Sequence, residues 1–288
     1  MRKIAAVIGA SAVLAVVPFA TTQAQDAPSV VRVVHGIGDS PNPVDVYIGA
    51  GSAPAQWDLA IEDLAFEEVA EVGNVPAGDY NVLLCDATQN PPATITSCPP
   101  LESDQPEGRA AVNGNSGTPI TLDPGVQTEV VAAWGGPGSP VVGRPTVVAY
   151  DLDTSCVDGA TPARITAVHA AVAPEVDVTA DSADLFTNLA FGNSDAADVP
   201  AATYSVGVEL ASDGTEVIAP FDADLQAQTN TVAIVVGFPE EQIAPMVIVD
   251  SIPLDECAVP VTTTSTAAPT TTTTFPARPA AAQPRFTG

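Results

Sequence analysis

Basic residues are scarce in this sequence. The chain has 8 Lys plus Arg against 35 Asp plus Glu, a formal net charge of −27, and Lys3 is the only lysine. Without residues 1–24, which we expect to be removed, 6 basic side chains remain against 35 acidic ones, a balance of −29. Nucleic acids and anionic membrane surfaces would repel such a chain, so neither is expected as a partner.

Aromatic residues and catalytic patterns are also sparse. Aromatics make up 5% of the chain, and no segment sustains a helical period of apolar residues, so cores of Val, Leu, Ile and Ala on alternating strands are expected. There is no nucleophile elbow, phosphate-binding glycine loop or His/Glu zinc helix. The stretch DLDTS at 151–155 begins like a calcium loop, but Cys156 stands where that loop needs glycine. We therefore expect no enzymatic activity and no cofactor.

Long apolar runs are confined to the N-terminus. A basic start followed by the apolar stretch Ile4–Ala20 and a small-residue site at Thr22–Ala24 predicts a signal peptide over 1–24. No later run is long enough to span a bilayer, so no membrane insertion of the mature chain is expected. Residues 259–288 are rich in Thr, Pro and Ala and predict a disordered stalk. The expected location is secreted, with cell-wall attachment as the alternative.

A short pattern occurs twice between these two ends. The first copy reads RVVH at 32–35, PVDVY at 43–47 and VPAGDYNV at 75–82. The second reads RITAVH at 164–169, PEVDV at 174–178 and VPAATYSV at 199–206. A repeat of this length indicates two copies of one module. We place the first module at 25–155 and the second at 156–258.

Period-two alternation predicts that both modules are β-sandwiches. About seven short strands bounded by Pro, Gly and Asp in roughly 100 residues is typical of an immunoglobulin-like sandwich. The fold prediction is therefore all-β, with two tandem immunoglobulin-like modules followed by the stalk. The predicted strands of the first module are 30–35, 44–48, 80–85, 128–134 and 146–150. Those of the second are 164–169, 176–179, 204–210, 216–220, 229–236 and 246–250.

Four cysteines lie in the exported part, and four allow three pairings. We favour Cys85 with Cys98 and Cys156 with Cys257, because each pair then lies within one module. The first pair would fix a Pro-rich loop, and the second would join the two ends of the second module. Export favours oxidation over metal binding, and the spacing does not match a zinc site.

The only two histidines, His35 and His169, recur at matching places in the two copies. Each histidine shares a face of its strand with apolar residues. On the neighbouring predicted strands, Asp45 and Asp177 lie on the face opposite the apolar residues of their own strand. We therefore interpret both histidines as structural and inward-pointing, and the aspartates as outward-pointing. A metal or catalytic role would require one of them to sit where the alternation fails.

A tyrosine follows the repeated Val-Pro-Ala element in each copy. Tyr80 and Tyr204 stand four residues after a proline and begin an alternating inward series. In sandwiches such a tyrosine can donate a hydrogen bond to backbone a few residues upstream, the tyrosine corner. We predict a structural role for both.

These repeated motifs resemble a family of secreted bacterial modules, domain of unknown function 4397, here in two tandem copies. The first copy matches closely. The second has Thr179 in place of the tyrosine and Ala202 in place of the glycine. The resemblance implies exported or cell-surface β-sandwich modules, and the Lys-poor composition with a Thr-rich stalk fits an actinobacterial source. No activity and no site residues come with the resemblance.

The expected function is non-enzymatic binding or structural presentation at the cell surface, with an unknown extracellular protein or glycan as partner. The long insert Cys85–Pro119 is the first candidate contact loop, and a disordered insertion is the other interpretation of it. A calcium-dependent adhesin or carbohydrate-binding module is the alternative function. It would use converging carboxylates or an exposed sugar platform of Trp57 and Trp134, although a tryptophan in a sandwich also suits the core.

Overall fold

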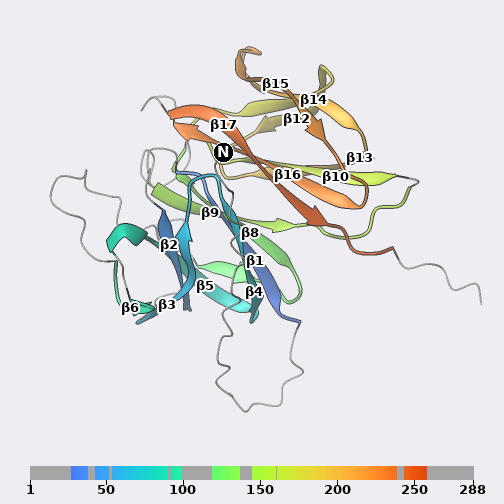
Figure 1. Ribbon diagram of the computed structural model, residues 1–288. Helices are drawn as coiled ribbons and strands as arrows, with labels where there is room; N and C mark the ends of the chain where they lie inside the picture. The colour runs from blue at the N-terminus through green and yellow to red at the C-terminus, as the bar shows by residue number, and fades with distance from the viewer. Residues whose placement is uncertain are drawn as a thin grey trace, which may run out of the picture. The chain divides into compact units, whose positions relative to one another are not determined.

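The computed structural model describes residues 27–37, 43–51, 54–89, 92–98, 119–136, 145–159, 161–238 and 243–257. The expected signal peptide and stalk lie outside these residues. By contact density the chain divides into Met1–Glu256 and Cys257–Gly288. The all-β prediction is confirmed for the described residues, which form four sheets in two halves (Figure 1). No described helix is long and apolar enough to cross a membrane.

The first half contains two facing sheets, ordered β4-β1-β8-β9 and β6-β3-β2-β5-β7. The 3-10 helix η1 (Ala87–Gln89) follows β5. The strands are β1 (Ser29–His35), β2 (Val44–Ala50), β3 (Trp57–Leu64), β4 (Val69–Val75), β5 (Gly78–Asp86), β6 (Thr94–Ile95), β7 (Ile120–Leu122), β8 (Gln127–Trp134) and β9 (Pro145–Leu152).

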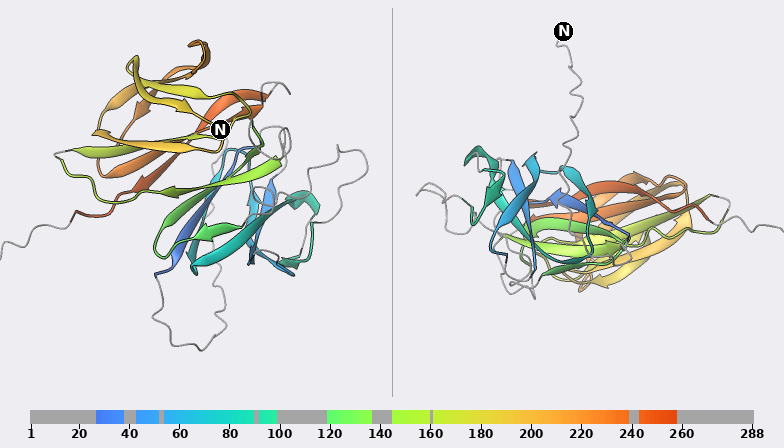
Figure 2. Two further views of the ribbon diagram at one scale, coloured as in Figure 1. Left: turned by 180° about the vertical axis from the view of Figure 1, so that it is seen from behind. Right: turned by 90° about the horizontal axis from the view of Figure 1, so that it is seen from below.

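The second half repeats this plan with sheets ordered β13-β10-β16-β17 and β12-β11-β14-β15 (Figure 2). Its strands are β10 (Pro162–His169), β11 (Val176–Ala180), β12 (Ala183–Leu189), β13 (Ser194–Pro200), β14 (Thr203–Leu210), β15 (Glu216–Asp224), β16 (Thr229–Phe238) and β17 (Ile243–Pro253). Along the chain, the first half ends with β9 and the second half begins with β10.

Alternating aliphatic residues fill the core between the two sheets of each half. Val31 and Val33 of β1 pack with Val130 and Ala132 of β8 in the first half. In the second half, Ile165 and Ala167 of β10 take part in the equivalent core. Burying each Val or Ile side chain contributes roughly 1.5–3 kcal/mol relative to leaving it exposed, so these cores hold the sheets together despite the few aromatic residues.

The strand order differs from that of the expected immunoglobulin type. An immunoglobulin sandwich places its first, second, fifth and fourth strands in one sheet. Here β1 does not pair with β2; it lies between β4 and β8, and its pairing with β8 is parallel. In the second half β10 pairs with β16 in parallel in the same way. The alternation of apolar residues predicts the strands but carries no information on which strands pair.

A further core joins the two halves. The outer face of β8 and β9 contributes Val131, Ala133 and Val148, and the outer face of β16 and β17 contributes Ile234 and Ile248. All five side chains are buried. One sheet of each half therefore has apolar residues on both faces, and we call this layer the shared core.

Candidate functional site

The two histidines lie at equivalent strand ends and are fully buried. The ring of His35 meets Phe66 edge to face, with centroids 6.0 Å apart, and the ring of His169 meets Phe191 at 6.3 Å. Both phenylalanines come from the turn that follows β3 or β12, within a repeated Leu-Ala-Phe that the sequence analysis did not use. The inward orientation expected from strand alternation is what the structure shows.

Backbone hydrogen bonds fix each histidine to that turn in the same way. The amide of His35 donates to Glu68 O at 3.1 Å and its carbonyl accepts from Glu67 N at 2.9 Å. The amide of His169 donates to Asn193 O at 3.0 Å and its carbonyl accepts from Gly192 N at 2.8 Å. Glu67 and Gly192 both have positive φ, as a tight turn requires. The two copies therefore superimpose with His35 on His169.

Both imidazole rings make hydrogen bonds to backbone groups. Ile37 N donates to Nδ1 of His35 at 3.3 Å, and Nε2 of His169 donates to Pro174 O at 2.9 Å. Burial lowers the pKa of His169, so its ring stays neutral at physiological pH. A neutral, buried ring held to backbone positions a loop and presents no nitrogen to solvent.

The recurring aspartates each hold a bulge in the neighbouring strand. Oδ1 of Asp45 accepts from Asp63 N at 2.9 Å, and Oδ1 of Asp177 accepts from Asn188 N at 2.7 Å. Asp63 and Asn188 have the same left-handed φ of 55° and lie where the register of the strand pair shifts. Asp45 is only 4% exposed, so its expected outward orientation does not bring it into solvent. The repeated His and Asp therefore act separately, each in a structural contact.

The two tyrosines pack against the cores as expected, and one completes the predicted hydrogen bond. The hydroxyl of Tyr204 donates to Pro200 O at 2.9 Å, four residues upstream, which is the tyrosine-corner geometry. Tyr80 packs on the first core, and burial raises its pKa.

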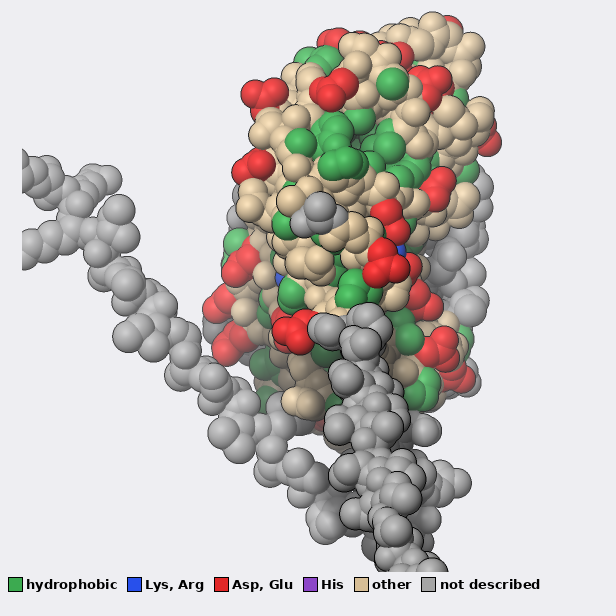
Figure 3. Space-filling model, turned by 90° about the vertical axis from the view of Figure 1, so that its right-hand side faces the viewer, with side chains coloured by type: hydrophobic (Ala, Val, Ile, Leu, Met, Phe, Trp, Pro, Cys, Tyr) green, Lys and Arg blue, Asp and Glu red, His purple; other side chains and the backbone are tan. Residues whose placement is uncertain are grey.

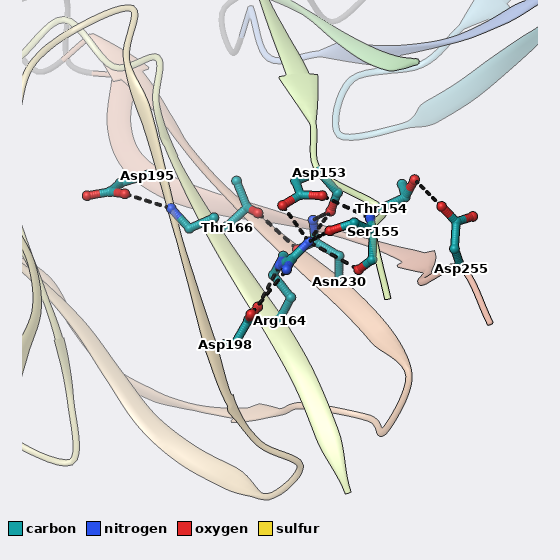
Figure 4. Close-up of polar contacts among 10 residues, drawn as sticks. Asp153, Thr154, Ser155, Arg164, Thr166, Asp195, Asp198, Asn230 and Asp255 are labelled. Atoms are coloured by element: carbon teal, nitrogen blue, oxygen red, sulfur yellow. Dashed lines mark hydrogen bonds and ion pairs between the residues drawn. The ribbon is translucent and has the colours of Figure 1, made fainter. Parts of the chain in front are cut away.

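The polar cluster drawn in Figure 4 surrounds Arg164 on β10. Its Nε and Nη2 contact the two carboxylate oxygens of Asp198 at 2.6 and 3.1 Å. Its Nη1 lies 2.8 Å from the carboxylate of Asp153 and donates to Asp153 O at 2.9 Å. Asn230 Nδ2 donates to the same carbonyl at 3.3 Å, and Asp255 N donates to Thr154 O at 2.7 Å. This cluster fastens the segment that joins the two halves.

A guanidinium thus lies where carboxylates converge. Asp198 raises the pKa of Arg164, and Asp153 has a lowered pKa because of its hydrogen bonds to Ser155 and its proximity to Arg164. The stretch that begins like a calcium loop, 151–155, contributes Asp153 to an arginine bridge. The positive charge among these carboxylates is the guanidinium of Arg164.

Arg32 does not occupy the position equivalent to Arg164. With the histidines superimposed, Arg32 on β1 matches Thr166, and Arg164 lies two residues earlier on β10. The two arginines begin the matching motifs RVVH and RITAVH, but the second copy has two extra residues before its histidine. Arg32 instead contacts Asp250 of β17 through Nε and Nη2 at 2.5 and 2.8 Å, and Glu71 of β4 through Nη1 at 2.9 Å. It therefore links the two halves.

Glu129 on β8 is the residue that the sequence analysis missed. Its side chain is fully buried beside Arg32, and both carboxylate oxygens lack a hydrogen-bond partner in the structure. Burial, together with the charge of Asp250, raises its pKa to about 8. The sequence does contain a sign of this setting, because Glu129 shares its strand face with the apolar residues Val131 and Ala133. The opposite face of β8 is apolar as well.

Cys85, Cys98 and the described part of the insert after β5 form a small core on the outer face of the first half. Cys85 and Cys98 form a disulfide with Cα atoms 5.4 Å apart. Ile95 packs there with Tyr47 and Trp57. Cys156 and Cys257 are also disulfide-bonded, and no described cysteine is free. The described part of the insert thus covers a sheet face, and residues 99–118 lie outside the description.

Neither tryptophan forms the exposed sugar platform that was considered. Trp57 is 7% exposed and Trp134 is 8% exposed. Trp57 belongs to the small core under the insert, and Trp134 to the main core of the first half. Both therefore have the structural role that was the other interpretation.

Several solved structures are weakly similar to this chain, among them the following three. The Bacillus anthracis TIE protein shares 12% identity with a TM-score of 0.19, covering 73% of this chain and 34% of that protein. The chain therefore spans about a third of the TIE protein. The fimbrial anchor protein Mfa2 from Porphyromonas gingivalis shares 9% identity with a TM-score of 0.20, covering 80% and 100% of the two chains. A candidate adhesin from Bacteroides ovatus shares 10% identity with a TM-score of 0.19, covering 80% and 96%.

Comparison at the level of sequence is more decisive. No curated protein matches the chain. The model of the family described as a domain of unknown function, DUF4397, matches residues 29–178. This match covers the whole first half and continues through β10 into β11. The second half is not matched as a separate copy, although it repeats the strand plan, the His–Phe contact and the Asp-held bulge of the first. The chain therefore belongs to the DUF4397 family.

Proposed function

We propose that this protein is a non-enzymatic, secreted or cell-surface protein that binds an extracellular partner through a rigid pair of β-sandwiches. The observation that carries the proposal is the shared core, which unites two sheets from different halves. Two sandwiches joined only by a flexible linker would need no such core. While the shared core is closed, the loops of both halves keep fixed relative positions, which favours recognition over chemistry.

The strand register places the chain connections together. Val30, at the start of β1, pairs with Gln127, which also pairs with Leu152 at the end of β9. In the second half, Arg164 near the start of β10 pairs with Asn230, which pairs with Ile252 near the end of β17. Each half therefore receives and releases the chain at one end, which we call the base.

The opposite end of each half carries the His–Phe turns, and we call it the tip. The tips of the two halves adjoin: a Cβ on Gly36 would lie 2.7 Å from Val236, and one on Gly136 would lie 2.3 Å from the ring of Phe191. If the chain is anchored through its C-terminal region, the tips are the parts farthest from the anchor. We propose the joined tips as the contact surface.

The surface charge narrows the class of partner. Asp and Glu side chains are spread over the face shown in Figure 3, with few basic groups among them. The two described arginines are engaged in ion pairs. A neutral or basic extracellular protein or glycan is compatible with such a surface, whereas a polyanion is not.

The test compares one substitution at the tip with the same substitution at the base. Ala65→Arg adds a long charged side chain to an exposed tip turn, and Ala202→Arg does so in an exposed turn at the base. Binding of the mature chain to cells and to arrayed extracellular glycans is measured for both, after equal melting temperatures are confirmed. Loss of binding in Ala65→Arg alone supports the proposal.

Equal binding by both variants would contradict the tip as the contact surface, and absence of binding by the unmodified chain would contradict the binding function. The same experiments are run with calcium and with a chelator. A large rise in melting temperature and binding that requires calcium would replace the proposal with the calcium-dependent adhesin.

A further inference from the structure

Glu129 occupies the middle of a cross-strand row that faces the second half. In register, Glu71 of β4, Arg32 of β1, Glu129 of β8 and Tyr150 of β9 lie side by side. The equivalent row of the second half is Ala196, Thr166, Val232 and Asp250. Val232 therefore holds the position of Glu129 in the second half.

This equivalence shows that a carboxyl group is not needed for packing at this position. Val232 is fully buried in the shared core, as an apolar side chain should be. Glu129 is equally buried, but each of its oxygens is without a partner, and so is the hydroxyl of neighbouring Tyr150. An ionised carboxylate buried without hydrogen bonds is strongly unfavourable, whereas the neutral acid is tolerated.

The groups that face Glu129 determine what its ionisation would do. Among the described residues, β1 presents Arg32, β9 presents Tyr150, and β17 presents Asp250, while β4 reaches the site only through Glu71 and Arg32. Gln127 shares the strand face, and β16 contributes apolar side chains. Of the described side chains that face Glu129, Arg32 alone is a cation, and Asp250 of the other half already engages it in a bidentate contact.

We propose that Glu129 is a proton-operated latch on the contact between the two halves. When it carries a proton, the shared core closes over a neutral side chain and Arg32 remains paired with Asp250. When the proton leaves to solvent, the carboxylate repels Asp250, competes for Arg32 and requires water. Separation of the two halves supplies that water. The latch thus couples pH to the relative position of the two tips.

The pH window follows from linkage. The pKa of Glu129 is raised from 4.5 to about 8 in the closed arrangement, and separation returns it towards its ordinary value. The population of separated halves should therefore rise by up to ~10-fold per pH unit above the ordinary pKa, and level off above the raised one. Low pH closes the latch.

Thiol labelling measures this opening directly, because no described cysteine is free. Ala133→Cys places one thiol in the shared core, and Ala167→Cys places one in the separate core of the second half. Labelling of the full mature chain by an alkylating reagent is followed between pH 5 and 9. Each rate is divided by that of the same chain unfolded in denaturant, which removes the titration of the thiol itself.

We expect faster normalised labelling at 133 than at 167, rising several-fold per pH unit to a plateau near pH 8. Adding Glu129→Gln should flatten that rise. Equal rates at the two positions would overturn the latch, because the interface would then open only in the unfolded chain. The same pH dependence with Glu129→Gln would overturn it too. If either cysteine lowers the melting temperature markedly, Ala133→Ser and Ala167→Ser serve as matched stability controls.

Discussion

Replacing Glu129 with Gln should stabilise the protein above neutral pH. Gln has almost the same shape and removes the ionisation, so the contrast between the two proteins isolates the cost of keeping this carboxyl group buried. In the folded protein its pKa is raised to about 8, and in the unfolded chain it returns to about 4.5. Between these values the unfolded chain is ionised while the folded protein retains the proton.

The sign and size of the effect follow. Because the folded state binds the extra proton, the free energy of unfolding falls by ~1.4 kcal/mol for each unit of pH increase across this window. Over the whole window the loss is roughly 4–5 kcal/mol, and it is complete above the raised pKa. Below the ordinary pKa both states are protonated and the penalty is absent. The variant should lack this slope.

Urea unfolding at closely spaced pH values between 7 and 8 measures the difference. In this range the contribution of His169 is constant, because its lowered pKa concerns only pH values below 6.5. We expect the urea midpoint of the unmodified protein to fall with pH while that of Glu129→Gln stays nearly level. Parallel lines for the two proteins would refute the assignment of a raised pKa to Glu129.

Other predictions concern the repeated contacts. His169 is buried and neutral, so stability present above pH 6.5 should be lost as pH falls below it, and His169→Phe should remove that loss in acid melting curves. Asp45→Ala leaves a part-buried bulge amide without its acceptor and should cost about 1–3 kcal/mol in urea unfolding, whereas Asp177→Ala, whose hydrogen bond is exposed, should cost about 0.5–1.5 kcal/mol; no change with Asp45→Ala would contradict the bulge role. Arg164→Met should make the 153–161 segment more sensitive to limited proteolysis and destabilise by about 2 kcal/mol, less than a fully buried pair because both carboxylates are partly exposed. Tyr204→Phe should cost about 1 kcal/mol, and a neutral result by calorimetry would remove the tyrosine corner.

Strands that carry runs of aliphatic residues were predictable from the sequence, whereas most strands that bury few side chains were not. Strands β1, β5, β8 and β16 carry alternating aliphatic residues and were predicted to within two residues at either end. Strands β3, β4, β12 and β13 were missed. Of these, β4, β12 and β13 are edge strands, whereas β3 lies between β2 and the two-residue β6, and β13 has the sequence SDAADVP with no buried residue. A strand that buries little needs little apolar sequence, so composition does not reveal it.

The structural roles of single residues divide in the same way. Alternation placed His35 and His169 inward because each is surrounded by apolar neighbours on its own strand. The apolar neighbours of Glu129 on its strand face are visible in the sequence, but the burial of that face depends on the second half packing over β8, a contact between distant parts of the chain. The alignment of Arg32 with Arg164 failed because the sequence offers no gap position, whereas the backbone hydrogen bonds of the two histidines define one.

The parallel pairing of β1 with β8 also sets an order of events during folding. The first described strand to be synthesised, β1, lies in the interior of its sheet, yet its partner β8 is among the last strands of that half to follow. Until β8 arrives, β1 can pair only with β4, and the sheet remains open on one side. Such long-range pairing slows folding, because the chain loses the entropy of loop closure before the stabilising contacts between the two strands can form. The growing chain therefore exposes an unsatisfied strand edge until nearly the whole first half has been made, and its strong negative charge would help to keep neighbouring chains apart during that interval.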